Sequence, residues 1–379
     1  KTREKITKLP FLPANSFPML INDYGMFLIG QKRVFWSKDL IHWQKVGEME
    51  MHGNINMFDY YIDRNSNKCY VYVGEYSCNP NHSHKVYRGI VNMDGTQEWK
   101  EILNFASLTE YKKDNSILTS ARHIHIVTVD PYTGYLWVGT GDEDIHSKIL
   151  FSTDYGESFQ ILGMGSQEWR TLSIWFTENY IYWNMDSHEP QKIFRIPRAK
   201  ITNNKMITPI LNSGFTKSGV QYLVIKQNEV QHYPVGVGEV YTETETRRID
   251  NDNQVMALND KEYDYREIVV ELVNGAHFNY CWAKDQNNEK LVIMAAAPEG
   301  NLRDMQGRVF GIKENPDGSV QVQELISLRA KKIKADYQIN MFTQLVPLFQ
   351  DNSGAIYFKS RNLNWTGIYK MKLEWNNPI

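Results

Sequence analysis

A strand–turn–strand pattern recurs along the whole chain and constrains its fold more than any other sequence feature. Each unit has a run of β-branched and aromatic residues, a turn containing Gly, Pro, Asn or Asp, and a second run. The runs start near residues 17, 56, 123, 169, 220, 277 and 339, and an apolar period of 3.6 residues is rare. Units recurring at roughly 40–60 residues predict an all-β fold, a seven-bladed β-propeller forming a single domain over residues 1–379.

The two ends of the chain and its middle complete this prediction. The last unit shows three convincing strands, and residues 4–9 form a spare strand. We expect this N-terminal strand to complete the last blade and close the ring, because closure removes an exposed sheet edge. The unit starting at residue 220 is the least regular, and its later strands are expected at residues 254–258 and 267–272.

One turn motif points to a known superfamily. The residues Ser152, Asp154, Gly156, Ser158 and Phe159 follow the spacing S-x-D-x-G-x-S-F. This motif resembles the Asp-box (BNR repeat) of the sialidase-like β-propellers, with Ser-Phe in place of Thr-Trp at its end. The turn needs an Asp that accepts backbone N–H groups and a Gly with positive φ. The resemblance implies a propeller blade and says little about chemistry.

Polar residues gather at the starts of several first strands. In a β-strand, residues two apart point to the same face, so these pairs are expected to line one central funnel. Channels are often polar simply because they hold water, but this set is rich in His, Asn and Arg. The ends of second strands return to the same face with Glu75, Tyr76, Asp142, Asp144, His146, Asp186, His188, Glu299, Ser360 and Arg361. From these positions, the funnel set of candidate site residues is Asn54, Asn56, His123, His125, Trp169, Arg170, His277, Asn279, Asn340, His146, His188 and Arg361.

These residue types suit β-elimination of a uronic-acid polysaccharide. Arg and Asn neutralise the substrate carboxylate, and a His or Tyr removes the acidified proton. By architecture and residue type, the chain is similar to seven-bladed polysaccharide lyases such as the ulvan lyases. The candidate catalytic residues are His123, His125, Arg170 and His277. The other residues of the funnel set are candidate substrate-binding residues.

Other readings of the same funnel stay open. A two-carboxylate glycoside hydrolase would use acids such as Asp142, Asp144, Asp186 and Glu75. A sialidase would need three Arg and a Tyr–Glu pair, and a third Arg beside Arg122 and Arg170 is not found. A non-catalytic glycan-binding propeller would use Trp169, Trp282 and Trp365 as platforms.

No cofactor is assigned from the sequence. His123 and His125, with His146 or His277, have the ligand types of a divalent metal site, but such pairs are more often hydrogen-bonded neighbours. A net charge of −2 does not indicate a nucleic-acid-binding surface. The expected partner is a polysaccharide or oligosaccharide. No apolar run approaches a membrane span, the oligomeric state stays open, and a secreted or periplasmic location is favoured over a cytoplasmic one.

Overall fold

The chain divides into two compact units, each described here by itself. The first unit comprises Lys1–Trp169, Ile207–Lys226 and Glu245–Asn259, and the second comprises Arg170–Met206, Gln227–Thr244 and Asp260–Ile379. The predicted single domain therefore stays a prediction. The computed structural model describes residues 17–21, 24–30, 32–51, 54–77, 84–105, 121–142, 146–164, 166–186, 191–202, 210–211, 223–225, 228–231, 240–243, 246–249, 255–256, 266–272, 280–296, 306–329, 344–361, 363 and 366–375.

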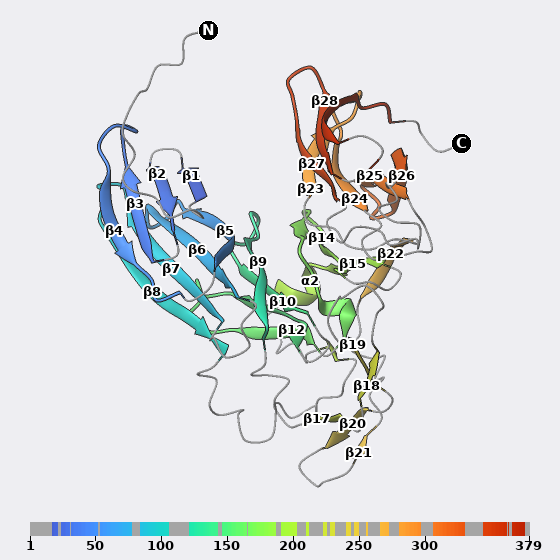
Figure 1. The fold of residues 1–379 in the computed structure, drawn as a ribbon, viewed down its shortest axis with the longest axis horizontal. Helices are drawn as coiled ribbons and strands as arrows, with labels where there is room; N and C mark the ends of the chain where they lie inside the picture. The colour runs from blue at the N-terminus through green and yellow to red at the C-terminus, as the bar shows by residue number, and fades with distance from the viewer. Residues whose placement is uncertain are drawn as a thin grey trace. The chain divides into compact units, whose positions relative to one another are not determined.

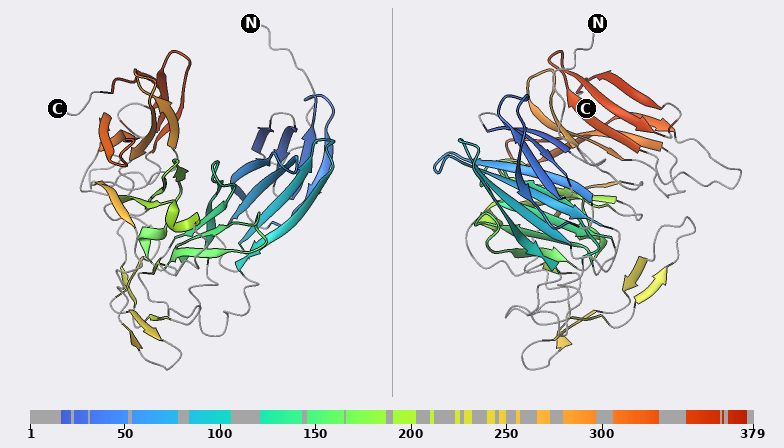
Figure 2. Two further views of the ribbon diagram at one scale, coloured as in Figure 1. Left: turned by 180° about the vertical axis from the view of Figure 1, so that it is seen from behind. Right: turned by 60° about the vertical axis from the view of Figure 1, so that its left-hand side comes forward.

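The first unit contains three sheets in which antiparallel strands follow one another in chain order. Figure 1 shows the first and second sheets side by side in blue and cyan, and Figure 2 shows them from two further sides. Their strands are β1 (Phe17–Ile21), β2 (Gly25–Ile29), β3 (Arg33–Ser37) and β4 (Gln44–Glu48), then β5 (Asn54–Asp63), β6 (Lys68–Tyr76), β7 (Lys85–Asn92) and β8 (Gln97–Asn104). The third sheet has β9 (His123–Val129), β10 (Leu136–Gly141), β11 (Lys148–Ser152) and β12 (Gln160–Met164), with β16 (Ile210–Leu211) added in parallel beside β12.

The second unit contains three more sheets of the same kind. The fourth sheet has β13 (Ile174–Phe176), β14 (Tyr180–Asn184), β15 (Gln191–Pro197) and β22 (Glu267–Leu272). Two further sheets have the strands β23 (Tyr280–Lys284), β24 (Lys290–Ala296), β25 (Gln306–Glu314) and β26 (Val320–Arg329), and then β27 (Gln344–Gln350), β28 (Ala355–Arg361) and β29 (Gly367–Lys372). The β27–β29 sheet has three strands in the described residues, as the sequence predicted.

Helices are short, and small strands fall between β15 and β22 in the sequence. The helical elements given for the described ranges are the 3-10 helix η4 (Gln167–Trp169) and α2 (Ala199–Thr202), which confirms the all-β prediction for this part of the chain. No helix in these ranges is long and apolar enough to cross a membrane. The small strands are β17 (Leu223–Ile225), β18 (Asn228–Gln231), β19 (Val240–Glu243), β20 (Thr246–Ile249) and β21 (Val255–Met256).

Local turn chemistry explains why these hairpins form. In the turn between β9 and β10, the Asp130 carbonyl accepts the Gly134 N–H at 2.8 Å, and Gly134 has a φ of +74°. In the turn between β11 and β12, Asp154 Oδ1 accepts the Ser158 N–H at 2.9 Å, and Gly156 has a φ of +92°. Both predicted turns are confirmed, and each uses a Gly where L side chains are strained.

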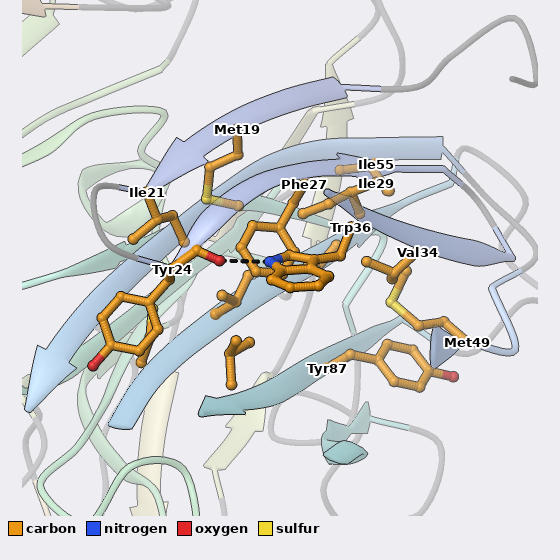
Figure 3. Packing of buried hydrophobic residues seen from close by; sticks show 14 of the residues in the cluster. Met19, Ile21, Tyr24, Phe27, Ile29, Val34, Trp36, Met49, Ile55 and Tyr87 are labelled. Atoms are coloured by element: carbon orange, nitrogen blue, oxygen red, sulfur yellow. Dashed lines mark hydrogen bonds between the residues drawn. The ribbon is translucent and has the colours of Figure 1, made fainter. Parts of the chain in front are cut away.

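Apolar faces of successive sheets pack on one another within the first unit. Buried side chains between the first and second sheets include Phe27, Val34 and Ile55 (Figure 3). The Trp36 indole in this layer donates to the Tyr24 carbonyl at 2.5 Å. A second layer, with Tyr72, Ile124 and Leu150, joins the second and third sheets. Stacked four-stranded sheets of this type have the topology of propeller blades.

The second unit corrects one prediction about blade order. The sequence placed residues 267–272 as a later strand of the unit that starts near residue 220, between the fourth sheet and the β23–β26 sheet. Instead, β22 pairs antiparallel with β15 and supplies the fourth strand of the fourth sheet. One apolar cluster, including Trp175, Tyr182 and Met294, joins the fourth sheet directly to the β23–β26 sheet. A fourth cluster joins β23–β26 to β27–β29.

The pairing of β22 with β15 changes the number of blades that the described residues support. Six sheets of three to five strands have the blade pattern in the described ranges, and the segment between β15 and β22 reads as an insertion within the fourth sheet. The predicted count of seven is not confirmed. The proposed closing strand at residues 4–9 lies outside the described residues, so closure stays a prediction.

Candidate functional site

The start of β9 carries the two histidines that the sequence singled out. His123 and His125 lie on one face of the strand, and their side chains are 1% and 2% exposed. Their rings stack with centroids 4.8 Å apart. In the β9–β10 pairing, Gly141 lies opposite His123, and a Cβ added to Gly141 would lie 2.2 Å from His125 Cε1. A glycine at the end of β10 is therefore what lets the His125 ring lie against the backbone.

Asp142, directly after β10, joins the two imidazoles. Its Oδ1 lies 2.9 Å from His123 Nε2 and 3.0 Å from His125 Nε2. Its Oδ2 lies 3.5 Å from the Nε of Arg122, and its backbone carbonyl accepts a hydrogen bond from Gln167 Nε2 at 2.9 Å. The side chains of Arg122 and Asp142 are 33% and 24% exposed. The carboxylate thus links two buried rings to a partly exposed guanidinium.

The end of β6 covers the other side of His123. The Tyr76 ring, which is half-buried, stacks on the His123 ring with centroids 4.1 Å apart. The carbonyl of Ser77 lies 3.3 Å from His123 Nδ1. We call Arg122, His123, His125, Asp142 and Tyr76 the histidine cluster. It combines groups for proton transfer, for binding an anion and for ligating a cation.

Three ligand atoms of the histidine cluster lie close enough to share one ion. The ligating atoms of His123, His125 and Asp142 all lie within 4.8 Å of one another. One of the two predicted third ligands, His146, lies beyond residues 143–145 and is half-buried. Its carbonyl accepts a hydrogen bond from Lys148 Nζ at 3.4 Å. The other, His277, lies outside the described residues.

A buried lysine lies on the neighbouring strand. Lys148 opens β11 opposite Thr140 and is fully buried, with its Nζ 5.3 Å from the centre of the Phe105 ring. Burial lowers the pKa of Lys148 to about 7, because a charged ammonium loses its hydration there.

Arg170 and Arg361, both predicted as site residues, belong to the second unit. Arg170 Nε donates to Asp186 Oδ2 at 3.0 Å, and both side chains are largely buried. Arg361 ends β28 and is exposed. The structure leaves untested the catalytic role predicted for Arg170 and the substrate contact predicted for Arg361, and the function proposed below gives the carboxylate-binding role to Arg122 instead.

Trp169 is placed differently from the sequence expectation. Its side chain is 0% exposed, and its ring fills the space where a Cβ on Gly163 would lie, at 2.3 Å. A sugar platform needs an accessible ring face, so the structure corrects this expectation in favour of core packing.

The remaining predicted site residues lie partly or wholly outside the described residues. Asn54 and Asn56 lie in β5, where Asn54 is paired with Tyr76, and their side chains are outside the described set. Residues outside the described ranges are His188, His277, Asn279 and Asn340.

The sequence reasoning missed the direct partners of the two histidines. Asp142 and Tyr76 were expected on the funnel face and Arg122 was weighed as a sialidase arginine, but none of them was paired with the histidines, and Gln167 was not considered. The hairpin held only part of the signal. The register set by the Asp130–Gly134 turn pairs Gly139 with Ile126, and a register shift between Gly139 and Thr140 then brings Gly141 opposite His123. The sequence does not mark this shift, after which Asp142 meets both histidines.

Comparisons with known proteins give no family. No protein-family model matches the chain, and no curated protein matches it. Among solved structures, a glucose dehydrogenase is similar at 10% identity, over 97% of this chain and 95% of that one, with a TM-score of 0.43. The soluble aldose sugar dehydrogenase from Escherichia coli is similar at 12% identity over 94% and 95% of the two chains, with a TM-score of 0.42. An endo-1,5-alpha-L-arabinanase from Thermotoga petrophila is similar at 12% identity over 97% and 92%, with a TM-score of 0.37. At these identities and TM-scores, the likenesses assign neither a family nor an activity to this chain.

Proposed function

We propose that the chain is a β-propeller enzyme that cleaves a uronate-containing polysaccharide by β-elimination at the histidine cluster. The observation that carries the proposal is the convergence of His123, His125 and Asp142 beside Arg122. An imidazole pair with a neighbouring guanidinium is the set of groups that elimination next to a carboxylate requires.

The reaction assigns a role to each side of the cluster. Arg122 binds the substrate carboxylate, which makes the proton on C5 more acidic. A base removes that proton, the C4–O bond breaks with its electron pair on the leaving oxygen, and a C4=C5 double bond forms. The leaving oxygen then takes up a proton. The partial exposure of Arg122 and Asp142 gives the substrate access from their side.

Two groups of the cluster are candidates for the base. One is an imidazole of His123 or His125, as expected from the sequence. The other is the phenol of Tyr76, which lies against His123 and is half-buried. A cation held by the two imidazoles would leave the proton removal to Tyr76.

Hydrolysis fits the geometry less well. Glycosidases use two carboxyl groups facing the scissile bond, either as acid and nucleophile or as acid and base. In the histidine cluster, Asp142 Oδ1 contacts both imidazoles, and Oδ2 faces Arg122. A carboxylate held in this way positions other groups instead of attacking or protonating the substrate.

The proposal is tested by incubating the protein with a panel of uronate polysaccharides and following ultraviolet absorbance of the unsaturated product. We expect rising absorbance with the wild type and a rate at least about 100-fold lower for His125→Ala, because positioned acid–base groups contribute factors of this size. His42→Ala is the matched control. His42 also pairs with an aspartate, Asp39, at 2.6 Å, but on the exposed turn after β3.

The possible outcomes separate the readings of the funnel. Growing reducing ends without absorbance would contradict elimination and favour hydrolysis. Binding to a polysaccharide without new chain ends would favour a glycan-binding protein. An equal loss of rate in His42→Ala and His125→Ala would contradict a role for the cluster.

A further inference from the structure

We infer that His123, His125 and Asp142 bind a divalent transition-metal ion. The inference deepens the proposed function, on which its catalytic consequence rests, by naming a cofactor for the same site. The starting observation is that the ligand atoms of two imidazoles and one carboxylate lie within 4.8 Å of one another.

The hydrogen bond to Ser77 fixes which nitrogen of His123 carries a proton. A backbone carbonyl only accepts hydrogen bonds, so His123 Nδ1 must donate to the Ser77 carbonyl at 3.3 Å. A neutral imidazole has a single N–H, and its Nε2 is then a bare lone pair. That lone pair faces Asp142 Oδ1 at 2.9 Å, where two acceptors oppose each other.

A positive charge between these atoms removes the conflict. A cation uses the Nε2 lone pairs of both imidazoles and the Asp142 carboxylate together, and the ligand atoms lie close enough to share it. The bond from Nδ1 to a backbone carbonyl is also the outer-shell contact that orients metal-binding histidines in many proteins.

The ligand types select the class of ion. Two imidazoles and one carboxylate suit Zn²⁺, Fe²⁺, Co²⁺ or Mn²⁺, whereas Ca²⁺ and Mg²⁺ prefer sites made of oxygen atoms. Gln167 holds the backbone of Asp142, and Gly141 admits the His125 ring, so the ligand set is supported by the fold around it.

A bound ion changes which groups neutralise the substrate carboxylate and which group acts as the base in the proposed elimination. With the imidazoles occupied as ligands, the cation and Arg122 together neutralise the substrate carboxylate. The phenol of Tyr76, stacked on His123, then takes the role of the base. The Tyr76→Phe variant is therefore expected to keep the ion and lose cleavage.

The test uses the full chain, stripped with a chelator and titrated with Co²⁺. Visible absorption and equilibrium dialysis report binding, and Zn²⁺ is added as a competitor. We expect one Co²⁺ per chain, and an affinity in Asp142→Asn that falls by more than the roughly 10–100-fold typical of losing an outer-shell partner. Asp39→Asn, in the exposed His42–Asp39 pair, is expected to bind Co²⁺ like the wild type.

A second measurement guards against a misfolded variant. The melting temperature of the wild type should rise with Co²⁺ concentration, because an ion that binds only the folded chain stabilises it. Absence of stoichiometric Co²⁺ and Zn²⁺ binding by the wild type, together with an unchanged melting temperature, would overturn the inference. The cluster would then be an imidazolium–carboxylate pair.

Failure of the metal inference and failure of the proposed function are distinguishable. Stoichiometric Co²⁺ binding without cleavage of any uronate polymer supports the metal site and refutes the function. Cleavage by a chain that binds neither Co²⁺ nor Zn²⁺ refutes the metal site and supports the function.

Discussion

The third and fourth sheets use the same construction at the start of their first strands, with different results. In both, an arginine before the first strand meets an aspartate after the second strand. In the fourth sheet, Arg170 and Asp186 form a 3.0 Å pair that is largely buried. In the third sheet, Arg122 lies 3.5 Å from Asp142 and is partly exposed, and the same aspartate also meets two imidazoles.

The difference separates a structural pair from a candidate site. A buried arginine matched by one carboxylate has its charge compensated within the fold. A carboxylate shared between His123 and His125 leaves its arginine facing solvent, where a substrate carboxylate can reach it. The same two residue types at equivalent places therefore serve stability in one sheet and, in our proposal, chemistry in the other.

The largest expected contrast is in stability. Arg170→Ala should lower the free energy of unfolding by about 3–5 kcal/mol, because it leaves the buried carboxylate of Asp186 without its arginine. Arg122→Ala should cost less than about 1 kcal/mol, since its pair is partly exposed. Urea denaturation of both variants measures the contrast, and equal losses would contradict it.

The next contrast is between the buried cations of the two sheets. Lys148 has a pKa near 7 in the folded chain, against an ordinary value of 10.5. Between these two pH values Lys148 is protonated in the unfolded chain and largely neutral in the folded chain. The free energy of unfolding therefore rises with pH over this range, by up to about 1.4 kcal/mol per pH unit. Lys148→Met should remove this slope and stabilise the protein most below pH 7. Replacing the buried cation of the third sheet is thus expected to stabilise the protein, whereas Arg170→Ala in the fourth sheet is expected to destabilise it.

Chemical denaturation between pH 6 and pH 10 measures the effect of Lys148→Met. A variant as pH-dependent as the wild type over this window would show that Lys148 does not carry the slope.

The last contrast combines a smaller loss of stability than that of Arg170→Ala with a local loss of the site. Gly141→Ala places a Cβ against the His125 ring and should cost about 1–3 kcal/mol, as overpacking does, while displacing the ring and abolishing Co²⁺ binding. Gly307→Ala in β25, whose Cβ would lie 3.2 Å from a flexible leucine, is the control and should keep the ion. Retained binding in Gly141→Ala would place the metal elsewhere.

Sequence reasoning succeeded where the deciding interactions are local. The Asp130–Gly134 and Ser152–Ser158 turns are set by side chains that bond within five residues, and the strand pairs beside them follow. The same-face placement of His123 and His125 follows from the two-residue period of a strand.

Sequence reasoning failed where the deciding contact is distant. The pairing of β22 with β15 crosses a long insertion, and an isolated apolar run carries no mark of its partner. Burial of Trp169 depends on the glycine that faces it, and a single tryptophan in a sequence reads equally well as a platform or as core.

The most direct test of this account is the rate of unsaturated-product formation by Arg122→Ala and Arg170→Ala, each assayed under conditions where it is folded. We expect the wild type to cleave a uronate polymer, Arg122→Ala to lose most of this rate, and Arg170→Ala to keep it. Loss of rate in folded Arg170→Ala with an unchanged rate in Arg122→Ala would contradict the account, as would a wild type that cleaves no uronate polymer.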